Sequence, residues 1–374
     1  MAFVFVPGYN LIISCIFIQN IMRNTKLTLL SLPGFLLLFM SANCQQPEAR
    51  FFDNRATIEQ WIKENHVPAL GIGILREGKL REIRIYGEIK TGDPASYNAI
   101  FNVASLTKPV VAMLTLKLVS NGAWNLDEPL SNYWVDPDIK DDPRHKKLTT
   151  RLVLSHQTGF KNWRYLNNDN KLAFDTTPGT RYGYSGEGFE YLRKALEKKF
   201  NKGIERLTDS LIFQPLGMND TRHAWDKFTD DNRFAHWYDK NGDEYKRDYK
   251  ATSIGAADDL LTTIEDYGKF AANVLQGGNP DSSVFNQMVR PHVPTEDGRY
   301  FGLGWEIFLD LGPKKEYALT HGGSDAGVRT LIILLPVSKQ GLIIFTNSDN
   351  GNKLHHKLIT EWLDTGKELM SRVK

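Results

Sequence analysis

Cysteine is scarce in this chain of 374 residues, and its two cysteines are Cys15 and Cys44. Because both lie within the first 44 residues, no disulfide framework and no cysteine-based zinc site can form downstream. The chain also lacks a large net charge, because 46 Lys and Arg residues are nearly balanced by 44 Asp and Glu residues. Its basic residues form no dense run. Nucleic-acid binding, which relies on clustered positive charge, is therefore not expected.

Several signatures of known catalytic sites are also missing. No serine has glycine both two residues before it and two residues after it, so the nucleophile elbow of the α/β-hydrolases is absent. Neither a His-Glu-x-x-His motif nor a phosphate-binding Walker loop occurs, and Gly71-Ile72-Gly73 is a poor glycine fingerprint. We accordingly expect no cofactor and no metal ion.

The start of the chain has the anatomy of an export signal. A basic stretch beginning at Met22 precedes an apolar stretch over residues 27–40, and small residues follow at 41–43. This order is typical of a secretory signal peptide. We expect Met22 to be the true start and residues 1–43 to be the export signal.

Cys44 directly follows that signal and resembles the cysteine of a bacterial lipobox, which receives a lipid, although Asn43 departs from the usual Gly or Ala. We expect a lipid anchor at Cys44, a tether over 44–51, and a periplasmic, outer-membrane or cell-surface lipoprotein. Plain secretion and an uncleaved anchor are the alternatives. A membrane span needs about 20 apolar residues, which no run here reaches without a polar residue or proline, so cleavage is favoured over spanning.

The periodicity of apolar residues predicts helices and strands in an order that indicates the fold. Helices are predicted at 56–65, 110–119 and 354–369, with a further one beginning near Phe189, and strands at 69–75, 80–86, 301–308, 317–320, 328–335 and 341–346. Strands and a helix at both ends, with helices between them, predict an α+β fold (α/β sandwich). One antiparallel sheet would be shared by the two chain ends and flanked by the N-terminal and C-terminal helices.

An all-helical subdomain would be inserted into that sheet. We expect a catalytic domain over 52–370, with sheet parts at 52–104 and 251–370 and the helical insertion at 105–250. An active site would then lie where the sheet and the helical insertion meet.

Ser105 and Lys108 form the first candidate for chemistry. They precede the apolar helical run 110–119, which places Ser105 at a helix N-terminus and Lys108 one turn further along the same face. The helix end and burial both disfavour an ammonium, so the pKa of Lys108 can fall towards that of a general base. The Ser105 amide is a candidate oxyanion donor. The alternative is an N-cap serine beside a surface lysine.

Two further clusters lie later in the chain. Tyr184, within the loop 178–186, can approach a catalytic serine, although a single tyrosine is more often a core residue. His321-Gly322-Gly323 follows a short strand, and its glycines would let a substrate lie against the edge of the sheet. A lone histidine is by default a structural residue.

The order of these clusters resembles the serine β-lactamase and penicillin-binding superfamily, in particular its branch of class C β-lactamases, D-alanyl-D-alanine carboxypeptidases and esterases. Segments typical of that branch span about 52–363, namely Leu152 to Phe160, Pro178-Gly179-Thr180, Leu216-Gly217-Met218, Phe301-Gly302-Leu303-Gly304-Trp305 and Phe345-Thr346-Asn347.

The resemblance implies catalytic roles for these residues. Ser105 would be the nucleophile, with Lys108 and Tyr184 taking its proton, and the amides of Ser105 and Ser324 would form the oxyanion hole. His321-Gly322-Gly323 stands where many members have Lys-Thr-Gly and would bind substrate. Because they lie near family segments, candidates for lining the acyl pocket are Trp163, Tyr165 and Trp305, with core packing as the alternative.

Two positions depart from the family pattern. Gly186 replaces the asparagine of Tyr-x-Asn, and His321 replaces a permanently charged lysine. Since a free histidine has a pKa of about 6.5, His321 is expected to be mostly neutral at pH 7. We therefore expect a serine hydrolase for small esters, amides or peptides rather than an efficient β-lactamase. The alternatives are a sensor that binds penicillin or peptidoglycan peptides without turnover, and a D-stereospecific peptidase or weak β-lactamase.

Overall fold

A computed structural model describes residues 52 and 54–373, except 247–249, 279 and 296–297. Met22, Cys44 and the predicted export signal and tether lie outside the described residues. Among the described residues, no helix has both the length and the apolar character needed to cross a bilayer.

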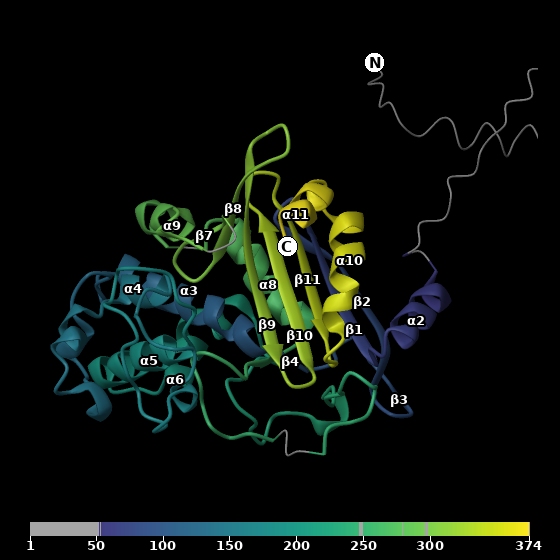
Figure 1. The fold of residues 1–374 in the computed structure, drawn as a ribbon. Helices are drawn as coiled ribbons and strands as arrows, with labels where there is room; N and C mark the ends of the chain where they lie inside the picture. The colour runs from purple at the N-terminus through teal and green to yellow at the C-terminus, as the bar shows by residue number, and fades with distance from the viewer. Residues whose placement is uncertain (1–51, 53, 247–249, 279, 296–297, 374) are drawn as a thin grey trace, which may run out of the picture. The chain divides into compact units, whose positions relative to one another are not determined.

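In the described part of the chain, a nine-stranded antiparallel sheet pairs early strands with late ones, as the sequence predicts (Figure 1). Strand β1 (Ala69–Arg76) pairs with β11 (Gln340–Thr346), and the strand order is β3-β2-β1-β11-β10-β9-β8-β7-β6. The other strands are β2 (Lys79–Lys90), β3 (Asp93–Pro94), β6 (Val293–Pro294), β7 (Tyr300–Phe301), β8 (Glu306–Leu311), β9 (Glu316–Asp325) and β10 (Val328–Leu335). A short second sheet pairs β4 (Phe101–Asn102) with β5 (Leu261–Thr262).

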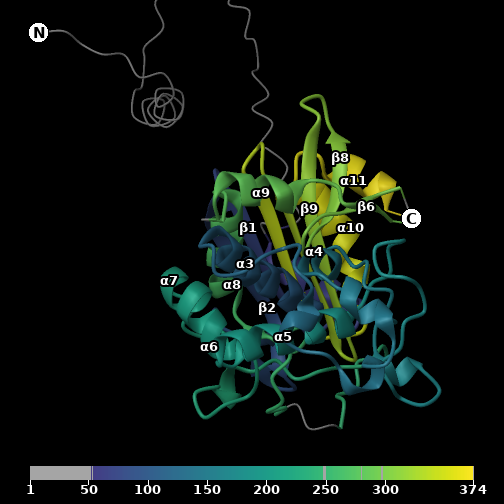
Figure 2. The same ribbon diagram turned by 90° about the vertical axis from the view of Figure 1, so that its left-hand side faces the viewer.

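Helices cover both faces of the large sheet (Figures 1 and 2). On one face, α2 (Arg55–Glu64), α10 (His355–Trp362) and α11 (Gly366–Arg372) pack with Leu70, Ile72 and Ile74 of β1 in one apolar core. The other face carries α3 (Thr107–Ser120), α8 (Ile264–Leu275) and the larger core. This alternation along β1 follows from the two-residue period of a strand.

The remaining helices extend the fold on the α3 side of the sheet. They are α4 (Thr150–Leu154), α5 (Gly186–Phe200), α6 (Ile204–Thr208), α7 (Gln214–Leu216) and α9 (Ser282–Val289). Figure 1 shows α4, α5 and α6 together, beside the lower half of β9.

Gly71 and Gly73 have a packing function rather than a ligand-binding one. A Cβ atom at Gly71 would lie 2.9 Å from Cγ1 of Ile264, and one at Gly73 would lie 3.0 Å from Cγ2 of the same side chain. The two glycines therefore let α8 lie close against β1.

Three predicted elements need correction. The run 301–308 is two strands, because residues 302–305 form a turn in which Gly304 has a φ of +84° and a Cβ at Gly302 would lie 2.3 Å from the carbonyl oxygen of Met288. The closing helix 354–369 is divided at Leu363, whose backbone is extended. The strand predicted at 317–320 runs on to Asp325, so His321 lies within it rather than at its end.

Candidate active site

Ser105 lies in a strained turn between β4 and α3. A single 3-10 turn, Ala104–Leu106, precedes the helix, and Ala104 has a φ of +47°, which is uncommon for a residue with a side chain. Asn102 holds this turn, because its side-chain oxygen accepts a hydrogen bond of 2.7 Å from the Ala104 amide. The turn brings Ser105 to the wall of a cavity.

Lys108 lies beneath Ser105 and is fully buried. Its Nζ donates to Ser105 Oγ at 3.0 Å and to the carbonyl oxygen of Ala257 at 2.7 Å. Burial lowers the pKa of Lys108, and the nearby carboxylates of Asp258 and Glu190 only partly oppose this shift. A neutral amine in contact with a serine hydroxyl is able to accept the hydroxyl proton.

A residue of α5 positions Ala257, whose carbonyl oxygen accepts the hydrogen bond from Lys108. Glu190 Oε1 accepts hydrogen bonds from the amides of Ala256 at 2.6 Å and Ala257 at 3.2 Å. Arg193 donates to the other Glu190 oxygen at 2.6 Å. Glu190 thus fixes the loop that positions Lys108, a role that no local motif in the sequence indicates.

Tyr184, on the loop before α5, lies next to Ser105 and Lys108. Its hydroxyl lies beside that of Ser105, and the Nζ of Lys108 lies 4.9 Å from the centre of its ring. Burial nevertheless raises the pKa of Tyr184, and the interaction with Ser105 offsets this only in part. A phenolate is therefore disfavoured, so Lys108 is the better base and Tyr184 the better proton donor.

His156 packs against Tyr184, a contact that the sequence did not indicate. The rings of His156 and Tyr184 have centres 4.2 Å apart, and the amide of Ser185 donates to His156 Nδ1 at 3.0 Å. The carbonyl oxygen of His156 accepts a further bond of 2.8 Å from the Gly183 amide. The segment 152–160 pointed here only through the family resemblance.

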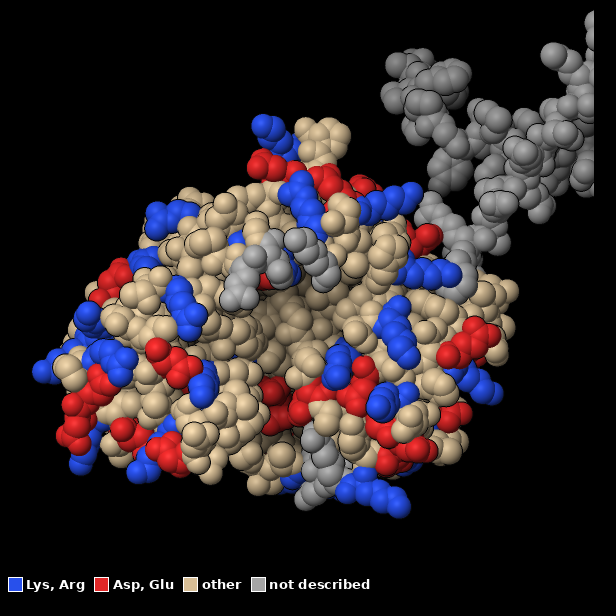
Figure 3. Space-filling model, viewed as in Figure 1, with Lys and Arg blue, Asp and Glu red and all other residues tan. Residues whose placement is uncertain are grey.

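The cavity beside Ser105, which we call the Ser105 cavity, has a volume of about 530 Å³. Figure 3 shows a hollow on the face where the helices meet β9. The lining residues are Ser105, Asn162, Tyr182, Tyr184, Phe301, Glu306, His321, Gly322 and Ser324. The structure thus brings together Ser105, Tyr184 and the predicted β9 residues 321, 322 and 324, with Lys108 directly behind them.

Gly323 does not line the cavity but allows β9 to pass close to the serine turn. A Cβ atom there would lie 2.2 Å from Thr330 Oγ1 and 2.3 Å from the carbonyl oxygen of Val103. Any larger residue would push the strand away from Ser105.

His321 is neutral in this cavity. It is 4% exposed, and burial, with the charge of Lys108 adding to it, lowers its pKa to about 3. Its Nδ1 lies 2.9 Å from the carbonyl oxygen of Gly322. A carbonyl oxygen only accepts, so the ring proton is on Nδ1 and Nε2 is an acceptor. His321 was expected from the sequence to be mostly neutral, and burial lowers its pKa further in that direction.

The structure does not bring the two tryptophans proposed for the acyl pocket into the cavity lining. Trp305 is fully buried in the larger core, where the turn 302–305 is packed. Trp163 covers Gly186 and stacks on Tyr165, with ring centres 6.4 Å apart. Both positions reflect packing against distant segments, which a motif neighbouring in sequence does not reveal.

Asn162, on a different loop, brings a side-chain amide to the cavity next to Gly186. Its Oδ1 accepts a hydrogen bond of 2.8 Å from the Gly186 amide, and its side chain lines the cavity. With Oδ1 engaged, the amide NH₂ group is the part of Asn162 available to a substrate carbonyl. An amide missing at position 186 is thus present from another loop.

Restoring asparagine at position 186 is expected to destabilise the protein. A Cβ atom there would lie 2.7 Å from Cη2 of Trp163, so Gly186→Asn should lower the free energy of unfolding by about 1–3 kcal/mol. In the double variant Gly186→Asn with Trp163→Ala the clash is absent, so urea unfolding should show a favourable coupling between the two changes. Strict additivity would contradict the predicted clash.

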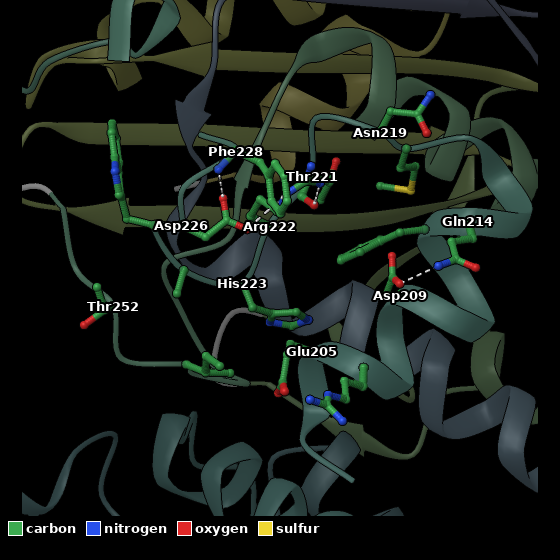
Figure 4. A pocket seen from close by; sticks show the side chains of 16 residues that line it. Glu205, Asp209, Gln214, Asn219, Thr221, Arg222, His223, Asp226, Phe228 and Thr252 are labelled. Atoms are coloured by element: carbon green, nitrogen blue, oxygen red, sulfur yellow. Dashed lines mark hydrogen bonds and ion pairs between the residues drawn. The ribbon is translucent and has the colours of Figure 1, made fainter. Parts of the chain in front are cut away.

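A second cavity, of about 500 Å³, lies beside α6 and α7 (Figure 4). Its one histidine, His223, has Nδ1 at 3.1 Å from the Gly255 carbonyl oxygen and Nε2 at 3.0 Å from Thr208 Oγ1. Asp209 accepts a bond from Gln214 there. The residues lining this cavity include no pair of nucleophile and base. Nowhere in the described part of the chain do three or more His, Cys, Asp or Glu residues gather as metal ligands.

The chain is similar to proteins related to β-lactamases. A family model described as Beta-lactamase matches residues 54–367. The D-alanyl-D-alanine-carboxypeptidase/endopeptidase AmpH of Escherichia coli K12 is 27% identical over 175 residues, which are 40% of this chain and 44% of AmpH. Esterase EstB of Burkholderia gladioli is 25% identical over 196 residues, which are 44% of this chain and 49% of EstB. The chain thus matches less than half the length of these two relatives.

A solved structure shows the same fold. The octameric penicillin-binding protein homologue from Pyrococcus abyssi superimposes with a TM-score of 0.68 and 22% identity, covering 79% of this chain and 73% of that one.

Proposed function

This chain belongs to the Beta-lactamase family, and from that premise we propose that it is a serine hydrolase acting through an acyl-enzyme on Ser105. The observation that carries the proposal is the 3.0 Å contact between the Ser105 hydroxyl and the buried amine of Lys108. A lysine with a lowered pKa in this position is a general base for its neighbour.

The reaction proceeds in two halves. Ser105 Oγ attacks the carbonyl carbon of an ester, amide or peptide as Lys108 takes its proton, and the amides of Ser105 and Ser324 stabilise the oxyanion. Tyr184, which is held protonated, gives its proton to the leaving group, and the Lys108 ammonium, which carries the proton taken from Ser105, reprotonates it. Water then attacks the acyl carbon and releases the acid and Ser105.

Small esters and amides are the proposed substrates. The names of the relatives include both an esterase and a carboxypeptidase/endopeptidase, so both kinds of carbonyl occur within the family. The NH₂ group of Asn162 supports binding of a substrate whose acyl part carries a second carbonyl oxygen, in addition to the one that is attacked. The neutral His321 provides no charge for a substrate carboxylate, which argues against efficient β-lactam turnover.

We further propose that the protein is exported and anchored through a lipid on Cys44. The support is the order of basic, apolar and small residues over 22–43 followed by cysteine. More than one acyl chain would be needed for a stable anchor. Residues 44–51 would then act as a short tether between the membrane and the hydrolase.

The time course of ester cleavage distinguishes a hydrolase from a sensor. Wild-type protein mixed with p-nitrophenyl butyrate should release nitrophenol continuously, and mass spectrometry after acid quenching should find one butyryl group on the peptide containing Ser105. A single stoichiometric burst without further turnover would instead indicate the sensor. Turnover with the acyl group on another residue would exclude Ser105 as the nucleophile.

A further inference from the structure

Two residues close to Ser105 and Lys108 have a left-handed backbone although each carries a side chain. Ala104, which directly precedes Ser105, has a φ of +47°. Asp259 has a φ of +70° and lies two residues after Ala257, the residue whose carbonyl oxygen binds Lys108. Such conformations are uncommon outside glycine and persist only where surrounding contacts hold them. Contacts that fix both residues are therefore expected beside the serine and the lysine.

The side chain of Asn102 forms hydrogen bonds with both of these residues. Its Oδ1 accepts a bond of 2.7 Å from the Ala104 amide, and its Nδ2 donates to Asp259 Oδ1 at 3.1 Å. Asn102 is 4% exposed and lies on β4, opposite Leu261 of β5. The two ends of one buried amide thus join the serine turn, Ala104–Leu106, to the segment 257–259.

Lys108 lies between the two parts of the chain that Asn102 joins. Its Nζ donates to Ser105 Oγ on the serine turn at 3.0 Å and to the Ala257 carbonyl oxygen in segment 257–259 at 2.7 Å. A shift of either part would change the distance over which the Ser105 proton is transferred. Misplacement of reacting groups by about 1 Å can lower a rate by about 100-fold.

Other hydrogen bonds tie the same parts of the chain together without the Asn102 side chain. The Val103 amide donates to the Leu260 carbonyl oxygen at 3.0 Å, and the Leu260 amide donates to Thr107 Oγ1 at 3.0 Å. Because these bonds remain when Asn102 is changed, the fold should survive its loss. Asn102 adds the side-chain link between the two left-handed residues.

We propose that Asn102 is a positioning residue that keeps the Lys108 amine within bonding distance of the Ser105 hydroxyl by holding the serine turn and segment 257–259 in place. This inference rests on the proposed acyl-enzyme function of Ser105 and names a residue that supports it. Asn102 is not among the described residues that line the Ser105 cavity. Its loss should therefore lower the rate of acylation rather than the affinity for the ester.

The first turnover of p-nitrophenyl butyrate, followed by stopped flow, measures this effect. In Asn102→Ala the maximal rate of acylation should fall by about 30-fold, while the half-saturating ester concentration should change by less than about 2-fold. Circular dichroism at the assay temperature restricts the comparison to folded protein. The matched control is Asn121→Ala, which changes an exposed asparagine at the C-terminal end of α3 and should acylate at the wild-type rate.

Glycine at position 104 tests the link to the serine turn. Glycine adopts a positive φ without the steric cost that alanine has, so a turn containing it depends less on Asn102. In the Ala104→Gly background, Asn102→Ala should slow acylation by less than about 5-fold instead of about 30-fold. A loss of the same size in both backgrounds would overturn the link between Asn102 and the serine turn.

A swapped pair tests the link to the base. Asn102→Asp retains an acceptor for the Ala104 amide but places a carboxylate against that of Asp259, so acylation should slow. Adding Asp259→Asn reverses the direction of the hydrogen bond and should recover at least about 5-fold of the rate. Because aspartate has the shape of asparagine, this test also applies if Asn102→Ala does not fold.

The possible results separate the inference from the function on which it rests. A swapped pair no faster than Asn102→Asp alone would overturn the link to the base. Acylation of folded Asn102→Ala at the wild-type rate would overturn the inference as a whole and leave the serine hydrolase intact. No acylation of the wild-type protein would overturn the proposed function itself.

Discussion

Ser105→Ala is expected to abolish turnover of p-nitrophenyl butyrate, with kcat lower by roughly 10⁴-fold or more. The variant lacks the oxygen that we propose as the nucleophile, and neither Lys108 nor Tyr184 can replace it in the same geometry. Any remaining rate would come from binding and from the oxyanion donors alone. The measurement is steady-state release of nitrophenol, with active-site concentration determined for the wild type by its acylation.

The fold should survive this change. Ser105 Oγ contacts Lys108 and Tyr184 but no apolar core residue depends on it, so the melting temperature should change by no more than about 2 °C. Ser371→Ala, an exposed serine on α11 on the opposite face of the sheet, is the matched control and should retain full activity. Full activity of Ser105→Ala would show that the nucleophile lies elsewhere.

The fold was predictable where local periodicity and chain order agree. Short apolar or β-branched runs bounded by turns indicated β1, β10 and β11, and strands at both ends of the chain indicated a shared sheet, which the pairing of β1 with β11 confirms. The turn 302–305 and the break at Leu363 were missed, because both depend on contacts with remote segments. Tertiary packing overrides local pattern at such positions.

The site was predictable where two residues sit on one turn of helix. Ser105 and Lys108 are three residues apart, so their proximity follows from helical geometry. Asn162 and Glu306 come from loops and strand ends whose approach to Ser105 depends on the whole fold, and no local pattern marks them. Trp305 illustrates the converse, since a place beside a family motif did not bring its side chain into the cavity.

The sequence alone does not decide which of Lys108 and Tyr184 is the base. Whether Lys108 or Tyr184 is the better base depends on how far each group is desolvated. In the structure burial lowers the pKa of Lys108 and raises that of Tyr184, so both shifts favour an uncharged pair. We therefore propose the Lys108 amine as the base, with the Tyr184 phenol protonated.

Lys108→Met is accordingly expected to lower kcat/KM for p-nitrophenyl butyrate by about 10³-fold. Methionine retains the length and apolar body of the lysine side chain but accepts no proton from Ser105. The pH profile provides the second readout. A base must be deprotonated, so wild-type kcat/KM should rise with pH through the lowered pKa of Lys108, with a midpoint below the ordinary lysine value of about 10.4.

Glu190→Gln tests that midpoint through a residue that does not contact substrate. The Glu190 charge raises the pKa of Lys108, so its loss should move the midpoint to lower pH, while the loosened 255–257 loop lowers the maximal rate. Lys108→Met should show no such rising limb in its residual activity. A limb of unchanged position in Lys108→Met would assign the titration to another group and remove Lys108 as the base.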